Sequence, residues 1–166
     1  GGISKKNKIK ILNTVFKFKN KKIVFLKVNK KILKVKKVLH FNQSAYYRLL
    51  LPDILPNVSR IIYFDCDLIF LKDIGSLYKI DLESKIVACC EEFHPNYKTA
   101  LRWLNSDVQF SKIVNSGVML MDLSKLRKGN YSQIFVDFAN KNSKKLLAAD
   151  QDIINIFLTN KIKVIS

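Results

Sequence analysis

Residues 60–67 read RIIYFDCD, in which four apolar residues run directly into two aspartates that are one residue apart. A short apolar run of this kind is typical of a buried strand. In an extended segment residues i and i+2 share a face, so Asp65 and Asp67 are predicted to point the same way. Open α/β sheets bind ligands beyond the carboxyl ends of their strands, and a carboxylate pair there suits a hard divalent cation, Mn²⁺ or Mg²⁺. The stretch therefore predicts a metal site that would connect the protein to substrate phosphates.

Helical and strand-like segments alternate on both sides of this stretch. Apolar residues recur at helical spacing in some segments, while short apolar runs indicate strands in others. Helices are predicted at residues 3–18, 42–51, 96–105, 131–145 and 150–158, and strands at 22–28, 60–65, 84–90, 118–121 and from 162 onward. The alternation predicts one α/β domain built on a largely parallel sheet.

The composition is that of a folded globular chain. Of the 166 residues 48% are hydrophobic, and only 5 are glycine and 3 proline, which excludes an intrinsically disordered or linker-dominated chain. No apolar run approaches the roughly 20 residues that span a bilayer. Because the chain begins without an initiator methionine and stops as a strand starts, we expect a fragment, truncated at both ends.

Positive charge is concentrated at the beginning of the chain. Residues 1–52 contain 14 lysines, Arg48 and no acidic residue, which gives +15 of the total +17. Such clustering would suit a nucleic acid or an anionic membrane. However, the chain has 26 lysines and 4 arginines, whereas phosphate and base recognition favours the bidentate arginine side chain. We therefore expect no nucleic-acid partner, and keep peripheral contact with an anionic membrane as a secondary property.

The three cysteines lack the spacing of a metal knuckle. They are Cys66, Cys89 and Cys90, an odd number with two adjacent members. We interpret them as ordinary buried thiols in a reducing compartment, which favours the cytoplasm.

Two classes of enzyme use a carboxylate pair at a strand end. In a haloacid-dehalogenase-like phosphohydrolase, Asp65 would be the nucleophile and Asp67 the general acid. In a nucleotide-sugar glycosyltransferase, both would hold a metal that neutralises the departing diphosphate. The phosphohydrolase pattern expects Thr or Val where Ile69 stands and usually lies on the first strand, so the transferase is favoured. A basic nucleic-acid-binding module using residues 1–37 is a third alternative.

Four blocks in a fixed order resemble glycosyltransferase family 8, which includes bacterial lipopolysaccharide galactosyl- and glucosyltransferases and is related to glycogenin. The blocks are NQSAYYRL at residues 42–49, IIYFDCDLIF at 61–70, NSGVMLMDL at 115–123 and DQDIIN at 150–155. The resemblance implies a GT-A fold, which is a Rossmann-like mixed sheet flanked by helices. It further implies a UDP-hexose donor, Mn²⁺ or Mg²⁺, and transfer with retention of anomeric configuration. It also implies a saccharide or lipid-linked saccharide acceptor, as in lipopolysaccharide or surface glycan synthesis.

The resemblance also assigns roles to individual side chains. These are Asp65 and Asp67 as metal ligands, with Asp65 also near the donor's ribose; Arg48 at the donor sugar and diphosphate; Asn115 and Ser116 in the sugar pocket; Asp150 as an acceptor from sugar hydroxyls; and Gln151 nearest the anomeric carbon. An amide is a poor nucleophile, so we favour attack on the face that the leaving group vacates. The amide oxygen of Gln151 would then stabilise positive charge on the sugar ring.

The family pattern also has parts that this chain does not match. We expect residues 1–166 to be a single GT-A-like domain that lacks the first nucleotide-binding strand and a later segment with a histidine as third metal ligand. His40 and His94 are the only histidines, and neither is assigned to the metal. The fragment is accordingly expected to be inactive alone.

Overall fold

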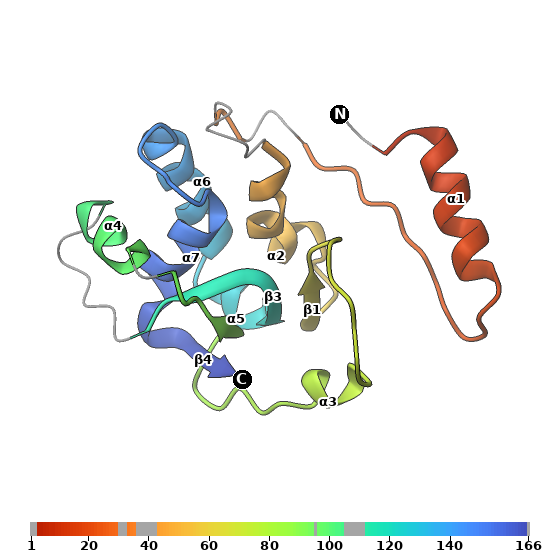
Figure 1. Cartoon of the computed structure of the whole chain (residues 1–166). Helices are drawn as coiled ribbons and strands as arrows, with labels where there is room; N and C mark the ends of the chain where they lie inside the picture. Colours follow the sequence, from red (N-terminus) through yellow and green to blue (C-terminus); the bar gives the residue numbers. More distant parts are fainter. Residues whose placement is uncertain (1–2, 30–32, 36–42, 95, 105–111, 166) are drawn as a thin grey trace.

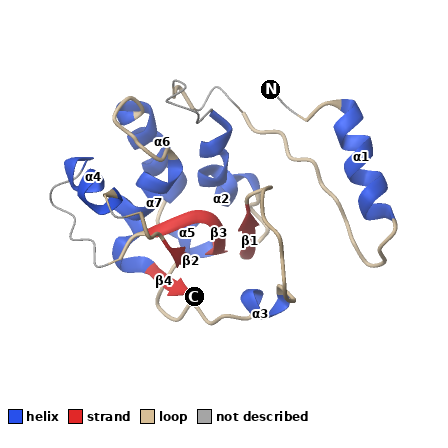
Figure 2. Cartoon of the chain, viewed as in Figure 1, coloured by secondary structure: helices blue, strands red, loops and turns tan. Residues whose placement is uncertain are grey.

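A four-stranded sheet with most of the helices gathered on one side forms the centre of the molecule (Figures 1 and 2). The computed structural model describes residues 3–29, 33–35, 43–94, 96–104 and 112–165. In chain order the elements are α1 (Lys5–Phe16), η1 (Gln43–Leu50, a 3₁₀ helix), α2 (Leu51–Ile54), β1 (Arg60–Phe64), α3 (Gly75–Tyr78), β2 (Val87–Glu91), α4 (Tyr97–Leu104), β3 (Val114–Asp122), α5 (Leu123–Lys128), α6 (Tyr131–Asn142), α7 (Asp150–Leu158), η2 (Thr159–Lys161) and β4 (Ile162–Ile165).

The strand order is β1-β3-β2-β4, and the sheet is mixed. β3 is antiparallel to both β1 and β2, while β2 and β4 are parallel. The largely parallel sheet predicted from the alternation of segments is therefore wrong, because β3 reverses direction between its two neighbours, whereas the mixed sheet implied by the family resemblance is confirmed. The reversal brings the end of β1 to the beginning of β3: Phe64 is paired with Val118, and the Asp65 amide donates to the Gly117 carbonyl at 2.9 Å. Residues 65 and 115–117 consequently meet at one edge of the sheet.

The two faces of the sheet are covered differently. One face carries Val87, Cys89, Met119 and Met121, which are buried with apolar side chains of η1, α5, α6 and α7 in the main core. The opposite face carries Ala88 and forms a smaller cluster. The alternation follows from the period of two in a strand, and it places α7 on the same face as Cys89.

Most predicted elements are present, with two exceptions. The predictions for β1, β2, α4, α6, α7 and β4 are confirmed to within a few residues. From residue 43 on, the predicted helix at 42–51 is instead the 3₁₀ helix η1 followed by α2, because Pro52 occupies the first turn of α2; residue 42 lies outside the described residues. The predicted strand at 22–28 is irregular and pairs with no strand in the described part of the chain. It leads back from α1, which stands apart from the sheet and contains no buried residue (Figure 1).

The cysteines differ in their environment. Cys89 is buried in the main core and Cys90 is partly buried, but Cys66 is exposed. The prediction of buried thiols is therefore wrong for Cys66, because β1 ends two residues before it and the chain bends into solvent there.

No helix within the described ranges combines the length and the apolar character that crossing a bilayer requires.

Candidate active site

Arg48 lies at the centre of a charged cluster where β1 ends and β3 begins. Its side chain is only 9% exposed, yet it forms two ion pairs, from Nη2 to Asp65 Oδ1 at 2.9 Å and from Nε to Asp150 Oδ2 at 3.1 Å. Nη1 donates to the Ser116 carbonyl oxygen at 2.7 Å. The guanidinium carbon lies 4.4 Å from the centre of the Tyr63 ring. One cation thereby connects η1, the end of β1, β3 and α7.

Asp150 is a buried carboxylate in the first turn of α7. Burial raises its pKa to about 7, although the Arg48 guanidinium and a hydrogen bond from the Ser116 side chain act in the opposite direction. The Nε–H of Arg48 donates to the Ala45 carbonyl at 3.2 Å, so Asp150 Oδ2 accepts no hydrogen bond from the described residues despite the ion pair. Buried acceptors without a donor are rare in folded proteins, and this one suits a ligand hydroxyl.

The backbone immediately before Asp150 is strained. Ala149 has φ 51° and ψ −114°, a region that residues with a side chain rarely adopt, and it is buried. Such conformations cost about 1–3 kcal/mol and persist where the surrounding structure imposes them. Here the strained residue determines where α7 begins, and with it the positions of Asp150 and Gln151 relative to β3.

Two amide side chains connect this region to a carboxylate that the sequence prediction did not include. Gln151 Oε1 accepts from the Ser116 amide at 3.1 Å, and its Nε2 donates to Glu92 Oε2 at 3.3 Å. Asn115 Oδ1 accepts from the Gly117 amide at 2.8 Å, and its Nδ2 donates to the same Glu92 oxygen at 3.1 Å. A signal for Glu92 was present in the sequence, because two glutamates follow the apolar run at 86–90.

Tyr63 is the second contributor that the sequence analysis missed. Its hydroxyl donates to Asp65 Oδ1 at 2.8 Å, and burial, followed by this hydrogen bond, raises the pKa of Tyr63 above its ordinary value. The phenol therefore stays protonated and remains a donor to Asp65. No sequence signal distinguished this tyrosine from the other apolar residues of its strand.

Gly117 permits a close approach between strands and side chains. The segment Asn115 to Gly117 lies within β3. A Cβ atom on Gly117 would lie 3.0 Å from Asn115 Oδ1 and 3.1 Å from Asp65 Oδ2. The absence of a side chain therefore leaves space for both site residues against the backbone of β3.

The two residues of the predicted metal pair lie in different surroundings. β1 ends at Phe64 and the chain bends at Cys66 and Asp67, so the extended geometry behind the prediction stops before the pair. Asp65 is bound to Arg48, whereas Asp67 is exposed and has no hydrogen bond or ion pair with the residues that the structure describes. Two carboxylates still fit a hard cation that keeps water and phosphate oxygens as its other ligands. Groups of three or more His, Cys, Asp or Glu suited to a metal do not occur among the described residues.

Asp150 and Asp152 form a second pair of aspartates that are separated by one residue, and the two have different roles. Unlike Asp150, Asp152 is completely buried and fully bonded: its carboxylate accepts from the Tyr97 hydroxyl, from the Leu147 amide at 2.6 Å and from the Ala148 amide at 3.0 Å. Burial raises the pKa of Asp152, while these hydrogen bonds act against the rise. Asp152 therefore holds the loop that precedes α7.

We expect Asp152→Ala to lower the free energy of unfolding by about 3 kcal/mol, because the buried Tyr97 hydroxyl and two partly buried backbone amides lose their acceptor. Urea unfolding followed by circular dichroism measures the change. Asp137→Ala is the matched control, since Asp137 is exposed on α6 and is expected to matter by less than about 0.5 kcal/mol. Equal stability of the two variants would contradict the assigned role of Asp152.

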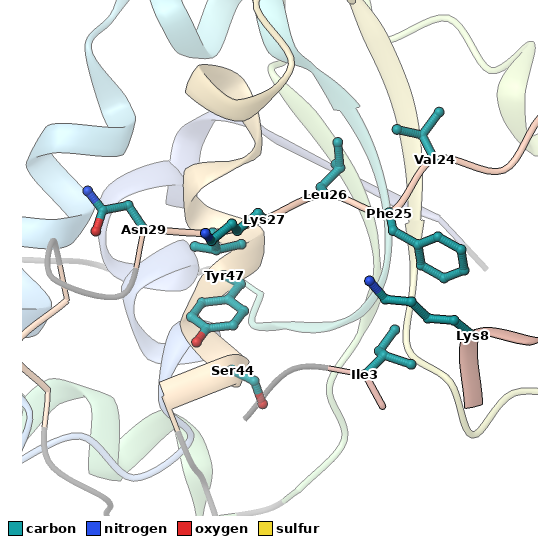
Figure 3. Close-up of a pocket in the computed structure, with 10 residues that line it drawn as sticks. Ile3, Lys8, Val24, Phe25, Leu26, Lys27, Asn29, Ser44 and Tyr47 are labelled. Atoms are coloured by element: carbon teal, nitrogen blue, oxygen red, sulfur yellow. The ribbon is translucent and has the colours of Figure 1, made fainter. Parts of the chain in front are cut away.

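A separate cavity of about 1170 Å³ lies between η1 and the N-terminal segment (Figure 3). Ser44 and Tyr47 line it from η1, and Lys8, Phe25 and Leu26 are among the residues that line it from the N-terminal segment. None of the predicted site residues lines it, although Arg48 follows Tyr47 directly in the sequence.

The mixed sheet and the helices on its main face form a GT-A fold. The chain superposes on the galactosyltransferase LgtC, solved in complex with donor and acceptor sugar analogues, with a TM-score of 0.78. The match covers 99% of this chain and 59% of LgtC at 21% identity, which establishes the fold.

Sequence comparison identifies the family. Residues 2–166 match the family model "Glycosyl transferase family 8". The chain is 32% identical over 163 residues to General stress protein A of Bacillus subtilis (strain 168), covering 95% of this chain and 56% of that protein. It is 41% identical over 100 residues to probable galacturonosyltransferase-like 4 of Arabidopsis thaliana, covering 53% of this chain and 28% of that protein.

The chain belongs to glycosyl transferase family 8, as the resemblance in its sequence indicated. It spans little more than half the length of General stress protein A and of LgtC.

Proposed function

We propose that this chain is the catalytic part of a metal-dependent, retaining glycosyltransferase that moves a hexose from a UDP-sugar to a saccharide acceptor. The observation that carries the proposal is the position of Arg48, bound to both Asp65 and Asp150 at the edge of the sheet. Gln151 is joined to the same place through the Ser116 amide. The complex of LgtC with donor and acceptor sugar analogues supports sugar transfer as the chemistry of the fold.

Each side chain of the cluster has one physical task in this proposal. The two carboxylates hold the Arg48 guanidinium in one orientation, ready to face the donor diphosphate. Asp150 Oδ2 accepts from a sugar hydroxyl, which supplies the donor that this buried oxygen lacks. Gln151 Oε1 is held by the Ser116 amide and keeps a second lone pair for the developing charge on the sugar ring.

Asp65 and Asp67 would hold Mn²⁺ or Mg²⁺. Arg48 and Tyr63 occupy Asp65 Oδ1, whereas Oδ2 has only a long contact of 3.5 Å with Arg48 Nη1. Oδ2 is therefore the oxygen that suits a cation. When bound, the ion would neutralise the negative charge that develops on the departing diphosphate.

The phosphohydrolase alternative requires Asp65 as a free nucleophile. Its Oδ1 is instead committed to an arginine and a phenol, both of which withdraw electron density from the carboxylate. The basic-module alternative uses residues that lie inside the family match from residue 2 onward. We therefore retain the transferase.

We further propose that the acceptor is a lipid-linked saccharide of a surface glycan or lipopolysaccharide at the cytoplasmic face of a membrane. The +15 charge of residues 1–52 would attract anionic headgroups and bring the enzyme to its acceptor.

The proposal is tested on the full gene product by UDP release from UDP-glucose or UDP-galactose. We expect release only with Mn²⁺ or Mg²⁺, and a loss of about 100-fold or more in Asp65→Asn and Asp67→Asn, because each change removes a metal ligand. Asp53→Asn is the matched control, since Asp53 is exposed on α2. Full activity of the Asp65 or Asp67 variant would eliminate the site.

The exposed thiol of Cys66 provides a readout that needs no turnover. Cys66 lies between the two aspartates, while Cys89 is buried and Cys90 partly buried. Mn²⁺ and UDP together are expected to slow alkylation of Cys66 several-fold, because the occupied site covers the thiol. Asp67→Asn should abolish this protection, and an unchanged rate in the unaltered protein would contradict binding at the pair.

A further inference from the structure

We propose that Glu92 is a positioning residue that fixes the orientation of the Gln151 and Asn115 amides. The inference rests on the proposed function, in which these two amides face the donor sugar. Glu92 Oε2 accepts from both, at 3.3 Å from Gln151 Nε2 and 3.1 Å from Asn115 Nδ2. A single carboxylate oxygen therefore controls two groups of the sugar pocket.

The chemistry of the partners determines which way each amide faces. The backbone amides of Ser116 and Gly117 can only donate, and each meets a side-chain oxygen, at 3.1 Å and 2.8 Å. An ionised Glu92 can only accept, so each amide nitrogen must turn towards it. Rotating either amide by half a turn would place donor against donor and acceptor against acceptor. The observed orientation is therefore the only one that satisfies all four hydrogen bonds.

Glu92 is itself held in place by the chain that follows it. Its Oε1 accepts from the His94 amide at 3.1 Å, and a further hydrogen bond comes from the Phe93 amide. Burial acts to raise the pKa of Glu92, but the hydrogen bonds from Asn115, His94, Gln151 and Phe93 outweigh it and leave the pKa below its ordinary value. The carboxylate thus remains an acceptor at neutral pH.

Glu92 lies beside an irregularity in the sheet. Cys89 points to the face covered by α7, and strict alternation would turn residue 92 to the opposite face. The pairing of β2 with β3 shifts register between Cys89 and Glu91, and the Glu92 amide still donates to Ile113 at 2.8 Å. Bulges of this kind redirect side chains near active sites. The extra residues of the shift lie on β3, between Val114 and Met119, where Asn115 and Ser116 stand. Glu92 follows the end of β2 at Glu91, where strict alternation no longer applies, and its carboxylate reaches Gln151 on α7.

The orientation matters for the charge presented to the sugar. With its nitrogen on Glu92, Gln151 directs its oxygen, the negative end of the amide dipole, away from the carboxylate. A charge-assisted hydrogen bond to the nitrogen also increases electron density on that oxygen. The reversed amide would present N–H groups to a cationic ring. Loss of Glu92 should therefore act mainly on the transition state, and lower kcat more than it raises KM.

The first test observes the amides directly, by ¹⁵N NMR of their side-chain NH₂ groups in this chain. In Glu92→Ala, the NH₂ signals of Gln151 and Asn115 are expected to move together, because both lose one acceptor. Glu91→Ala is the matched control, since Glu91 pairs with Lys112 at 2.7 Å and has neither amide as a partner. Unchanged NH₂ signals in Glu92→Ala would overturn the proposal.

The second test measures kcat and KM in the full gene product. Glu92→Ala is expected to lower kcat about tenfold or more with KM within a few-fold, and Glu92→Gln, which keeps one acceptor oxygen, to lie between it and the unaltered enzyme. Glu92→Gln also serves if the alanine variant does not fold. NH₂ signals that move while kcat stays unchanged would reduce Glu92 to a structural contact and overturn the proposal. Absence of turnover in the unaltered protein would instead remove the proposed function, which the NMR experiment does not depend on.

Discussion

Replacing Arg48 by methionine is expected to lower the free energy of unfolding by about 3 kcal/mol at pH 8. The loss at pH 5 is expected to be smaller than the loss at pH 8 by at least about 1 kcal/mol. Arg48 is the described cation that pairs with both Asp65 and Asp150, and Asp150 is only 3% exposed. Arg48 lowers the pKa of Asp150, so without it the carboxyl at pH 8 must either stay charged while buried or take up a proton against the pH. At pH 5 Asp150 carries a proton, because its pKa is about 7, and no buried charge is uncovered.

Urea unfolding at both pH values measures this difference. Arg102→Met is the matched control, because Arg102 is exposed on α4 and is expected to change stability by less than about 0.5 kcal/mol at either pH. Arg48→Lys keeps the charge but cannot serve two carboxylates with one planar group, so it should recover only part of the loss. In the full gene product, Arg48→Met should lower turnover about 100-fold. If Arg48→Met lowers the free energy of unfolding equally at pH 5 and pH 8, the assigned coupling to Asp150 is contradicted.

The parts of the fold that the sequence predicted are those with a local signal. β1 was recognisable because four apolar residues end at an aspartate, and α7 because its apolar residues recur behind an acidic first turn. The six residues that the family resemblance gathered around the donor sugar and Asp65 do lie in one connected network. Their roles remain predictions, because contacts alone do not report chemistry.

The parts that were not predicted depend on contacts between distant segments. The direction of β3 follows from its pairing with β1, more than 50 residues earlier, and no local pattern encodes that pairing. Glu92 was missed because it follows the end of β2 at Glu91, where strand alternation no longer determines which way a side chain points. The different surroundings of Asp65 and Asp67 follow from the end of β1 at Phe64, whereas the prediction assumed that the strand continued.

The cluster is organised at the expense of stability. Asp150 is buried with an oxygen that accepts no hydrogen bond from the described residues, and it follows Ala149 in a strained conformation. Neither feature helps the chain to fold. Residues that lower stability in this way are expected where function requires them. This predicts that stability and activity respond in opposite directions to a change at Asp150.

Asp150→Asn is therefore expected to be more stable than the unaltered chain at pH 8 and equal to it at about pH 4. Asp150 has a pKa raised from 3.8 to about 7, so between these values the unfolded chain releases a proton that the folded chain keeps. Stability supplied by the protonated group is present below about pH 4 and is lost as the pH rises to about 7. The rise of the Asp150 pKa from 3.8 to about 7 corresponds to about 4 kcal/mol. This is the upper limit for the gain in the free energy of unfolding of Asp150→Asn at pH 8.

Thermal unfolding of both proteins between pH 4 and pH 8 isolates this contribution, because the other titrating groups are common to both. Asp137→Asn is the control, and its difference from the unaltered chain should not depend on pH in this range. In the full gene product Asp150→Asn should lose about 100-fold in turnover despite its added stability, because a neutral amide accepts a sugar hydroxyl less strongly than a carboxylate. If the variant were instead less stable at pH 8, the ion pair with Arg48 would be a net contribution to folding. Asp150 would then be explained by structure alone, and its position would no longer indicate a place for the sugar.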